Sequence, residues 1–422
     1  MVSMPPVPGI LMGVTRTSLI TWGLVAILAG TQGACRRQAV VTPTPPPPWA
    51  AYTPRHDGSN AYDTYLLAGQ DALVRAPNSA KVSTWTATTK DALERALSPA
   101  LDQLRTGHGQ SFRSEARPRP LGVDEPVYNG WRLLTIALNV RIERLLAEDN
   151  LADAVTWCMV ATRFGARLSQ TGLEGATLGT GLMDSVRRQL APKLVQLSAV
   201  DLQRIENELA ETHRQAPNLD DAFAAEANQQ QQFINDLSQR QGGQAPLLTE
   251  QLGSRGAQAV ETFMQAGESE RATWITNMTA EAARIREEAN AQRNPDAPAP
   301  PRAEWWQKER ERPWSPLTQH LLLGPRVLPA IEKRYLSKLR LFALAAALQR
   351  HVVNAKSAPS KLPALDPELL TDPYSGRPFI YRAVGREFQV YSVGANKKDD
   401  GGETDRNGEV PDVALETRAF GF

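Results

Sequence analysis

The sequence predicts a mainly α-helical protein, with a body of helical hairpins followed by a small α+β domain at the C-terminus. Apolar residues recur at helical spacing over most of residues 60–209. A longer apolar helical stretch, Ile331–Asn354, is then followed by two short runs of β-prone residues, which predict a hairpin. We therefore expect the strands to lie at the end of the chain, beside its longest helix.

Length and composition limit the functional classes. The chain has 422 residues, enough for roughly two or three domains. Its 41% hydrophobic and 22% charged residues are typical of a soluble globular protein. A formal net charge of +1 provides no field that would attract DNA or RNA, so a nucleic acid is not an expected partner. The 2 cysteines, Cys35 and Cys158, are too few for a disulfide-built scaffold.

The N-terminus predicts export. Arg16 precedes an apolar run, Thr17–Gly30, and small residues follow it, which is the pattern of a secretory signal peptide. The run is short for a membrane span, which needs roughly 20 apolar residues. We expect five regions along the chain: a signal peptide at 1–35, a proline-rich linker at 36–58, a helical domain at 59–212, a Gln/Ala-rich region at 213–315 and a C-terminal module at 316–422.

The end of the signal segment resembles that of a bacterial lipoprotein. Gly33-Ala34-Cys35 matches the site at which a cysteine thiol is lipidated and becomes the new N-terminus, although Gln32 stands where that motif usually has Leu. The alternative is an ordinary cleavage site beside an incidental cysteine. The proline-rich chain that follows is stiff and extends about 3.1 Å per residue, which suits a spacer between a membrane and a folded body. We therefore expect an exported envelope protein that is tethered to a membrane through Cys35.

Local patterns predict the helices of the body and their ends. An apolar stripe precedes Asp149-Asn150, which offers a break and a cap before a second helix at Leu151–Gln170, so the two should form an antiparallel hairpin. Cys158 lies in the second helix, where a buried and unreactive thiol is expected; a Cys35–Cys158 disulfide is the weaker alternative. The stripe consists of Leu134, Leu138, Ile142 and Leu145.

Three further signals follow the hairpin. Gly175 and Gly179 are four residues apart, which would let another helix approach closely. Pro192 should end or kink its helix. Ser198 resembles an N-cap, with Asp201 at the third helical position. Leu202, Ile205 and Leu209 continue that helix on one face.

Residues 213–315 are rich in Gln, Asn, Ala and Glu, including a glutamine run at Gln229–Gln232. They predict either a lightly packed helical excursion or a partly disordered segment. Trp305, Trp306 and Trp314 could form a binding surface, but such residues more often hold a chain segment against a core, and we favour that interpretation.

The C-terminal module begins with a helix that is apolar on all sides over Leu341–Leu348, so we expect the following strands to cover it. Pro378–Arg382 and Glu387–Val393 predict these strands. The Ala383–Arg386 turn between them contains Gly385.

In order, these residues resemble the C-terminal domain of the type II secretion major pseudopilin, a likeness also seen in uncharacterised exported bacterial proteins. It covers about the last quarter of the chain. The matching positions are Asp372-Pro373-Tyr374, Gly376, Pro378 and Tyr381, followed by Tyr391-Ser392-Val393-Gly394-Ala395-Asn396.

The resemblance implies a calcium site, because the corresponding pseudopilin loop binds this ion. The candidate ligands are Asn396, Asp399, Asp400, Glu403 and Asp405. Their oxygens suit calcium, which takes six to eight oxygen ligands. Asn396 stands where the family tends to have Asp, and Lys397-Lys398 add positive charge. The alternative is a solvated acidic turn.

Two observations limit the functional reading. A pilin subunit joins its fibre through a hydrophobic N-terminal helix that continues into its C-terminal domain. Here most of the chain separates Thr17–Gly30 from the module, so we expect a reused end-domain and not a fibre subunit. The second observation is that metal-ligand pairs and a GxSxG motif are absent from the sequence. The histidines are scattered singly, as His56, His108, His213, His320 and His351.

These observations predict a non-enzymatic, membrane-tethered envelope protein with a structural or protein-interaction role. An accessory component of a type II secretion-like system is one alternative. An envelope enzyme of unrecognised class, with a site assembled from distant residues, is the other. The expected partners are the membrane, through the lipid on Cys35, and other envelope proteins; calcium is the one cofactor suggested, and no small-molecule ligand is identified.

Overall fold

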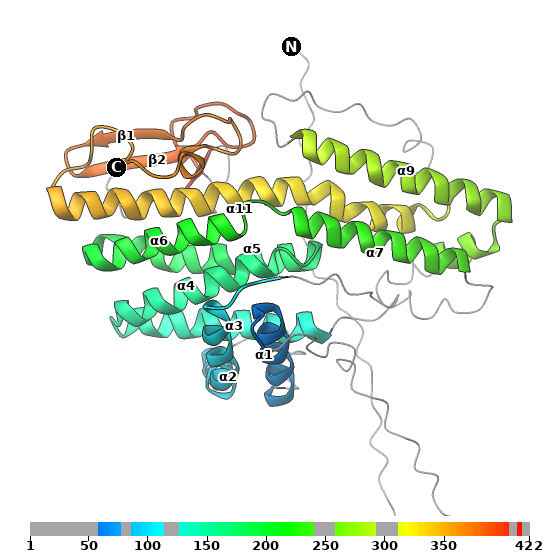
Figure 1. Ribbon diagram of the computed structural model, residues 1–422, viewed down its shortest axis with the longest axis horizontal. Helices are drawn as coiled ribbons and strands as arrows, with labels where there is room; N and C mark the ends of the chain where they lie inside the picture. The colour runs from blue at the N-terminus through cyan, green and yellow to red at the C-terminus, as the bar shows by residue number, and fades with distance from the viewer. Residues whose placement is uncertain are drawn as a thin grey trace, which may run out of the picture. The chain divides into compact units, whose positions relative to one another are not determined.

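Helices form most of the chain that the computed structural model describes, which comprises residues 58–76, 86–113, 126–239, 258–292, 311–404 and 412–415 (Figure 1). The helices are α1 (Ala61–Arg75), α2 (Ala87–His108), α3 (Pro126–Ala147), α4 (Leu151–Leu168), α5 (Leu173–Leu190), α6 (Ala199–Gln215), α7 (Asp220–Gln239), α9 (Glu268–Gln292), α11 (Ser315–Ala355) and α12 (Pro367–Leu370), with a 3-10 helix, η3, at Ala191–Gln196. Three strands, β1 (Ile380–Val384), β2 (Glu387–Ser392) and β3 (Val413–Ala414), form an antiparallel sheet in that order. The prediction of a mainly helical protein with a small sheet near its C-terminus is confirmed.

None of the described helices combines the length and the apolar character that a membrane span needs. The apolar run Thr17–Gly30 and the linker at 36–58, up to residue 57, lie outside the described residues.

The predicted hairpin corresponds to α3 and α4, which pack against each other. Its turn forms as expected: Asp149 adopts a left-handed backbone with φ of 55°, and the side chain of Asn150 accepts a hydrogen bond from the N–H of Asp153. All four residues of the predicted stripe, Leu134, Leu138, Ile142 and Leu145, are buried.

Glycine allows α4 and α5 to pack with their backbones in contact. A Cβ atom on Gly179 would meet the carbonyl oxygen of Gly165, and one on Gly165 would lie 2.7 Å from the carbonyl oxygen of Gly179. A Cβ on Gly175 would meet the carbonyl oxygen of Leu168. The close approach predicted from Gly175 and Gly179 is therefore confirmed.

The next two signals are also confirmed. Helix α5 ends at Leu190 and the chain continues as η3, with Pro192 in the first turn, where the missing N–H of proline costs little. The hydroxyl of Ser198 caps α6 by accepting the N–H of Asp201. The predicted apolar face of α6 is buried at Leu202, Ile205 and Leu209.

Within residues 213–315, the described residues form helices and a separate apolar core. Phe263 and Trp274 pack at 4.6 Å between ring centroids, and Phe263 and Trp314 at 5.9 Å. Trp314 is buried, so it holds its segment against this core, as we favoured. Trp305 and Trp306 lie outside the described residues.

The longest helix differs from its prediction, because α11 begins at Ser315 and not at Ile331. The stretch before Ile331 is helical because burial of Leu317, Leu322 and Leu328 holds it in place. As Figure 1 shows, α11 runs beside α6, α7 and α9 and also carries the sheet. The strands therefore cover Leu341–Leu348 only in part, since α5 and α6 pack on α11 as well. One apolar core extends from Ala61 to Leu415 and includes both the body and the C-terminal strands.

The predicted β-hairpin is present, shifted slightly along the chain. Val384 pairs with Glu387 across a two-residue turn, in which Gly385 has φ of 64°. Phe388 and Val390 point from β2 into the core. The short strand β3 was not predicted.

Candidate functional site

A buried carboxylate, Asp372, joins the two segments that resemble a pseudopilin. Oδ1 accepts hydrogen bonds from the Ser392 hydroxyl (2.7 Å) and the Tyr374 N–H (3.0 Å). Oδ2 accepts from the Ser375 hydroxyl (3.1 Å) and the Val393 N–H (3.2 Å). Hydrogen bonds to a charged acceptor are stronger than neutral ones. Asp372 therefore fixes the turn that follows α12 against the end of β2.

The acidic loop begins beyond β2, and one of its candidate ligands, Asp399, already has partners within the protein. Asp399 accepts hydrogen bonds from the Tyr391 hydroxyl (2.7 Å), the Gly401 N–H (2.9 Å) and Arg382 (3.1 Å). The Tyr391 hydrogen bond, followed by that of Gly401, holds the pKa of Asp399 below its usual value. Asp399 is thus an ionised carboxylate that a guanidinium already partly neutralises.

The other predicted ligands do not converge with Asp399 among the described residues. The Asn396 amide donates to Asp400 at 2.6 Å, and the main-chain carbonyl of Glu403 accepts the Asp412 N–H at 3.1 Å. Within the described parts of the chain, no three acidic, histidine or cysteine side chains gather where they could share an ion. Asp405 lies outside those parts, so the five-ligand calcium site stays a prediction.

The structure adds one acidic residue to this loop that we did not select from the sequence. Asp412 is fully buried; Oδ2 accepts the Gly402 N–H at 2.7 Å, and Oδ1 is buried and accepts no hydrogen bond from the described residues. Burial raises the pKa of Asp412, and the nearby carboxylates of Asp400 and Asp399 raise it further. Its position at the end of a polar acidic run carries no signal of this burial, because the burial depends on packing beside β3.

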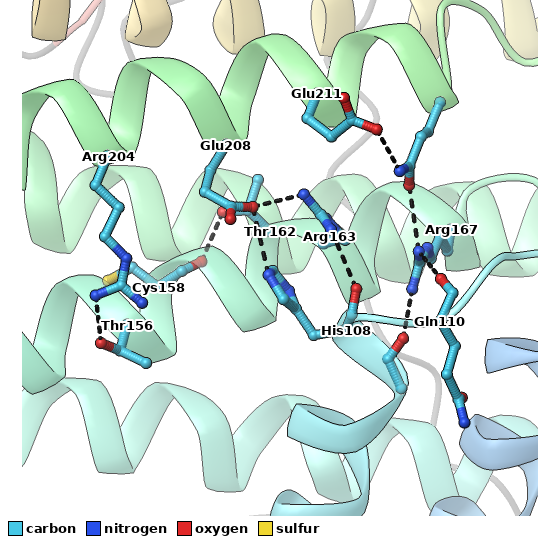
Figure 2. A network of polar contacts seen from close by, with 12 residues as sticks. His108, Gln110, Thr156, Cys158, Thr162, Arg163, Arg167, Arg204, Glu208 and Glu211 are labelled. Atoms are coloured by element: carbon cyan, nitrogen blue, oxygen red, sulfur yellow. Dashed lines mark hydrogen bonds and ion pairs between the residues drawn. The ribbon is translucent and has the colours of Figure 1, made fainter.

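A second polar cluster lies where the end of α2 meets α4 and α6 (Figure 2). Glu208 Oε2 accepts a hydrogen bond from Arg163 at 2.6 Å and lies 3.3 Å from His108 Nε2. Arg163 also donates to the main-chain carbonyl of His108 at 3.1 Å. The His108 hydrogen bond, together with the charge of Arg163, keeps the pKa of Glu208 below its usual value.

Arg167 extends this cluster to the end of α2. It donates to the carbonyls of Gly107 (2.8 Å) and Gln110 (2.6 Å) and to the Tyr65 hydroxyl (2.8 Å). Carbonyls in the last turn of a helix lack helical partners and carry partial negative charge, which arginine satisfies. The cluster therefore joins α2, α4 and α6. Arg163 pairs with the carboxylate of Glu208, and Arg167 satisfies carbonyls at the end of α2.

The cysteines and the other histidines singled out from the sequence do not form a common site among the described residues. Cys158 is buried as a free thiol whose pKa is raised by burial, as expected, whereas Cys35 lies outside the described residues. His213 is buried beside Arg340, and His351 is exposed. His56 and the side chain of His320 fall outside the described residues.

Comparison with known proteins does not assign the chain to a family. No protein-family model, no curated protein and no solved structure matches it. The resemblance to the pseudopilin domain therefore remains a prediction from the residues quoted above.

Proposed function

We propose that the protein is an exported envelope protein that is tethered to a bacterial membrane by a lipid on Cys35 and has a structural or protein-interaction role, not an enzymatic one. The N-terminal pattern supports the export and the tether: a basic residue, an apolar run, Gly33-Ala34-Cys35 and then a proline-rich linker. The folded body follows this linker.

The observation that carries the non-enzymatic role is the use of the polar cluster in Figure 2. The imidazole of His108 faces Glu208, and Arg163 and Arg167 donate to carbonyls at the end of α2. If His108 were a general base, a group that gives up a proton would have to lie within hydrogen-bond reach of its imidazole. The group that the imidazole faces is the carboxylate of Glu208. Nearby, the Thr162 hydroxyl donates to the main-chain carbonyl of Cys158 at 2.8 Å, inside its own helix. These groups stabilise contacts between helices.

The two cysteines provide a matched experiment for the tether. A Cys35→Ala variant should leave the membrane fraction and lose incorporation of a labelled fatty acid. A Cys158→Ala variant should keep both, because Cys158 is buried in α4. Membrane association and label that persist in Cys35→Ala would refute the lipid tether.

A second candidate is an accessory role in a type II secretion-like system. It is supported by Asp372, which brings the Asp-Pro-Tyr turn and the Tyr-Ser-Val-Gly segment together, the two segments on which the resemblance rests. The test is direct binding of the purified protein to purified pseudopilins of the same bacterium. Binding that weakens in Asp372→Asn would support the role, and no binding at micromolar concentration would contradict it.

We also propose that calcium stabilises the loop after β2. The buried Oδ1 of Asp412 lies in a group close to Asp400 and accepts no hydrogen bond from the described residues; this supports a cation there, because a buried carboxylate oxygen without a hydrogen bond is costly. The charge of Arg382 on Asp399 acts against it.

A further inference from the structure

His213 accepts a hydrogen bond that only a neutral imidazole can accept. It lies in the last turn of α6, 2% exposed, and its Nε2 is 3.1 Å from Nε of Arg340 on α11. Because the guanidinium is always a donor, Nε2 must carry a lone pair and the proton must be on Nδ1. Protonation would bring two N–H groups and two positive charges face to face.

The groups around this contact do not offset that repulsion. From α11, Arg340 faces the ring, and the hydroxyl of Tyr335 donates to the Ala216 carbonyl just beyond α6. From α12 and its cap, Glu368 Oε2 lies 3.9 Å from His213 Nδ1, and Asp366 lies near; both carboxylates are exposed. Exposed charges are screened by water, so they stabilise an imidazolium only weakly.

The same arginine holds the segment that leads into the sheet. Nη1 of Arg340 donates to the carbonyl of Thr371 at 2.8 Å. Thr371 follows α12 directly and precedes Asp372, the carboxylate that fixes the turn to the end of β2. One guanidinium thus connects the end of α6 to the segment Asp366–Asp372.

We propose that His213 and Arg340 form a pH-sensitive latch, which holds Asp366–Asp372 against the end of α6 at neutral pH and releases it in acid. Protonated His213 has to turn away from Arg340, and the arginine then loses its position against Thr371. Release would loosen the C-terminal sheet, while the contacts that join helices α1 to α5 to one another remain.

The sign of the pH dependence follows from the protonation states. Burial, reinforced by Arg340 and opposed by Asp366, lowers the pKa of His213 from 6.5 to about 4. An opened latch exposes an imidazole that takes up a proton near pH 6.5. The closed state is therefore fully stabilised above pH 6.5 and loses that advantage as the pH falls toward 4. The open population should rise by about tenfold per pH unit across this window.

Hydrogen exchange of the full chain, corrected for the intrinsic exchange rate at each pH, tests the latch. Amides of Leu369, Thr371 and Phe379 donate within the chain and report its closure. We expect their protection to fall more than tenfold between pH 6.5 and pH 4.5. In His213→Gln, whose amide oxygen accepts but does not titrate, protection should stay constant. His351→Gln removes an exposed imidazole from α11 and should behave as the wild type.

An equal loss of protection in His213→Gln and in the wild type would overturn the latch, as would a wild-type segment that stays protected at pH 4.5. If His213→Gln does not fold, NMR titration of the wild-type histidine ring protons decides the matter, with assignment from single substitutions of the other histidines. One ring should remain neutral to well below pH 6, and a full set of ordinary titrations would refute the latch.

Discussion

A single methyl group at Gly179 should separate two helices. The Cβ of Gly179→Ala would meet the carbonyl oxygen of Gly165 and lie 2.6 Å from the Ser169 hydroxyl and 2.9 Å from its main-chain nitrogen. The carbonyl belongs to the backbone of α4 and the nitrogen to its C-cap residue, so no side-chain rotation relieves these two contacts, and α4 and α5 must move apart. The substitution therefore adds a methyl group where the two helix backbones leave no space for it.

The magnitude follows from two opposing effects. Overpacking of a core costs about 1–3 kcal/mol, and rigid backbone neighbours place this site toward the upper end. Alanine in place of glycine inside a helix stabilises it by about 1 kcal/mol. We expect the free energy of unfolding of Gly179→Ala to fall by about 1–2 kcal/mol.

Gly181 provides the matched control, because it is exposed on the same helix and a Cβ there meets no atom of the described residues within 4 Å. Gly181→Ala should raise the free energy of unfolding by about 0.5–1 kcal/mol. Urea unfolding followed by circular dichroism measures both variants. An unfolding midpoint for Gly179→Ala at or above that of the wild type would refute the close contact between α4 and α5.

Three further predictions concern separate parts of the molecule. If calcium stabilises the acidic loop, a chelator should lower the melting temperature of the full chain and added calcium should restore it; an unchanged melting temperature would count against the ion. Asp372→Asn would turn an amide N–H toward groups that are themselves donors, so it should lower the free energy of unfolding by about 2–4 kcal/mol. Asp366→Asn, at an exposed helix cap, should lower it by about 1 kcal/mol or less. Equal effects of the two substitutions would contradict the role of Asp372. Phe263→Ala should lower the stability of the second core by about 3–5 kcal/mol. Hydrogen exchange should therefore accelerate in α9, which belongs to this core, and not in α4. Equal acceleration in both helices would contradict two separate cores.

Signals that act between neighbouring residues predicted several helix ends and turns correctly. Asn150 caps α4 through Asp153, Ser198 caps α6 through Asp201, and the turn at Gly385 joins two strands. Each of these contacts spans only a few residues, so the sequence contains both partners within one window.

Errors and omissions occurred where distant residues decide the structure. The longest helix was expected to begin at Ile331, but the side chain of Trp274 donates to Thr318 and packs the early part of α11 into the second core. The short strand β3 forms only because Ser392 and Val413 pair across a loop. The burial of Asp412 was not predicted either, because it also depends on contacts across this loop.

By itself, the sequence determined that the chain is mainly helical, where α4 and α6 begin and α5 ends, and that a hairpin follows the longest helix, since periodicity and capping are local properties. It also carries the case for export and for Cys35, which lie outside the described residues. Only the tertiary structure decided that Asp372 and Asp412 are buried and that His213 faces Arg340, 127 positions away. Those properties depend on desolvation and on partners that the chain brings together by folding, and a local pattern of residues contains neither.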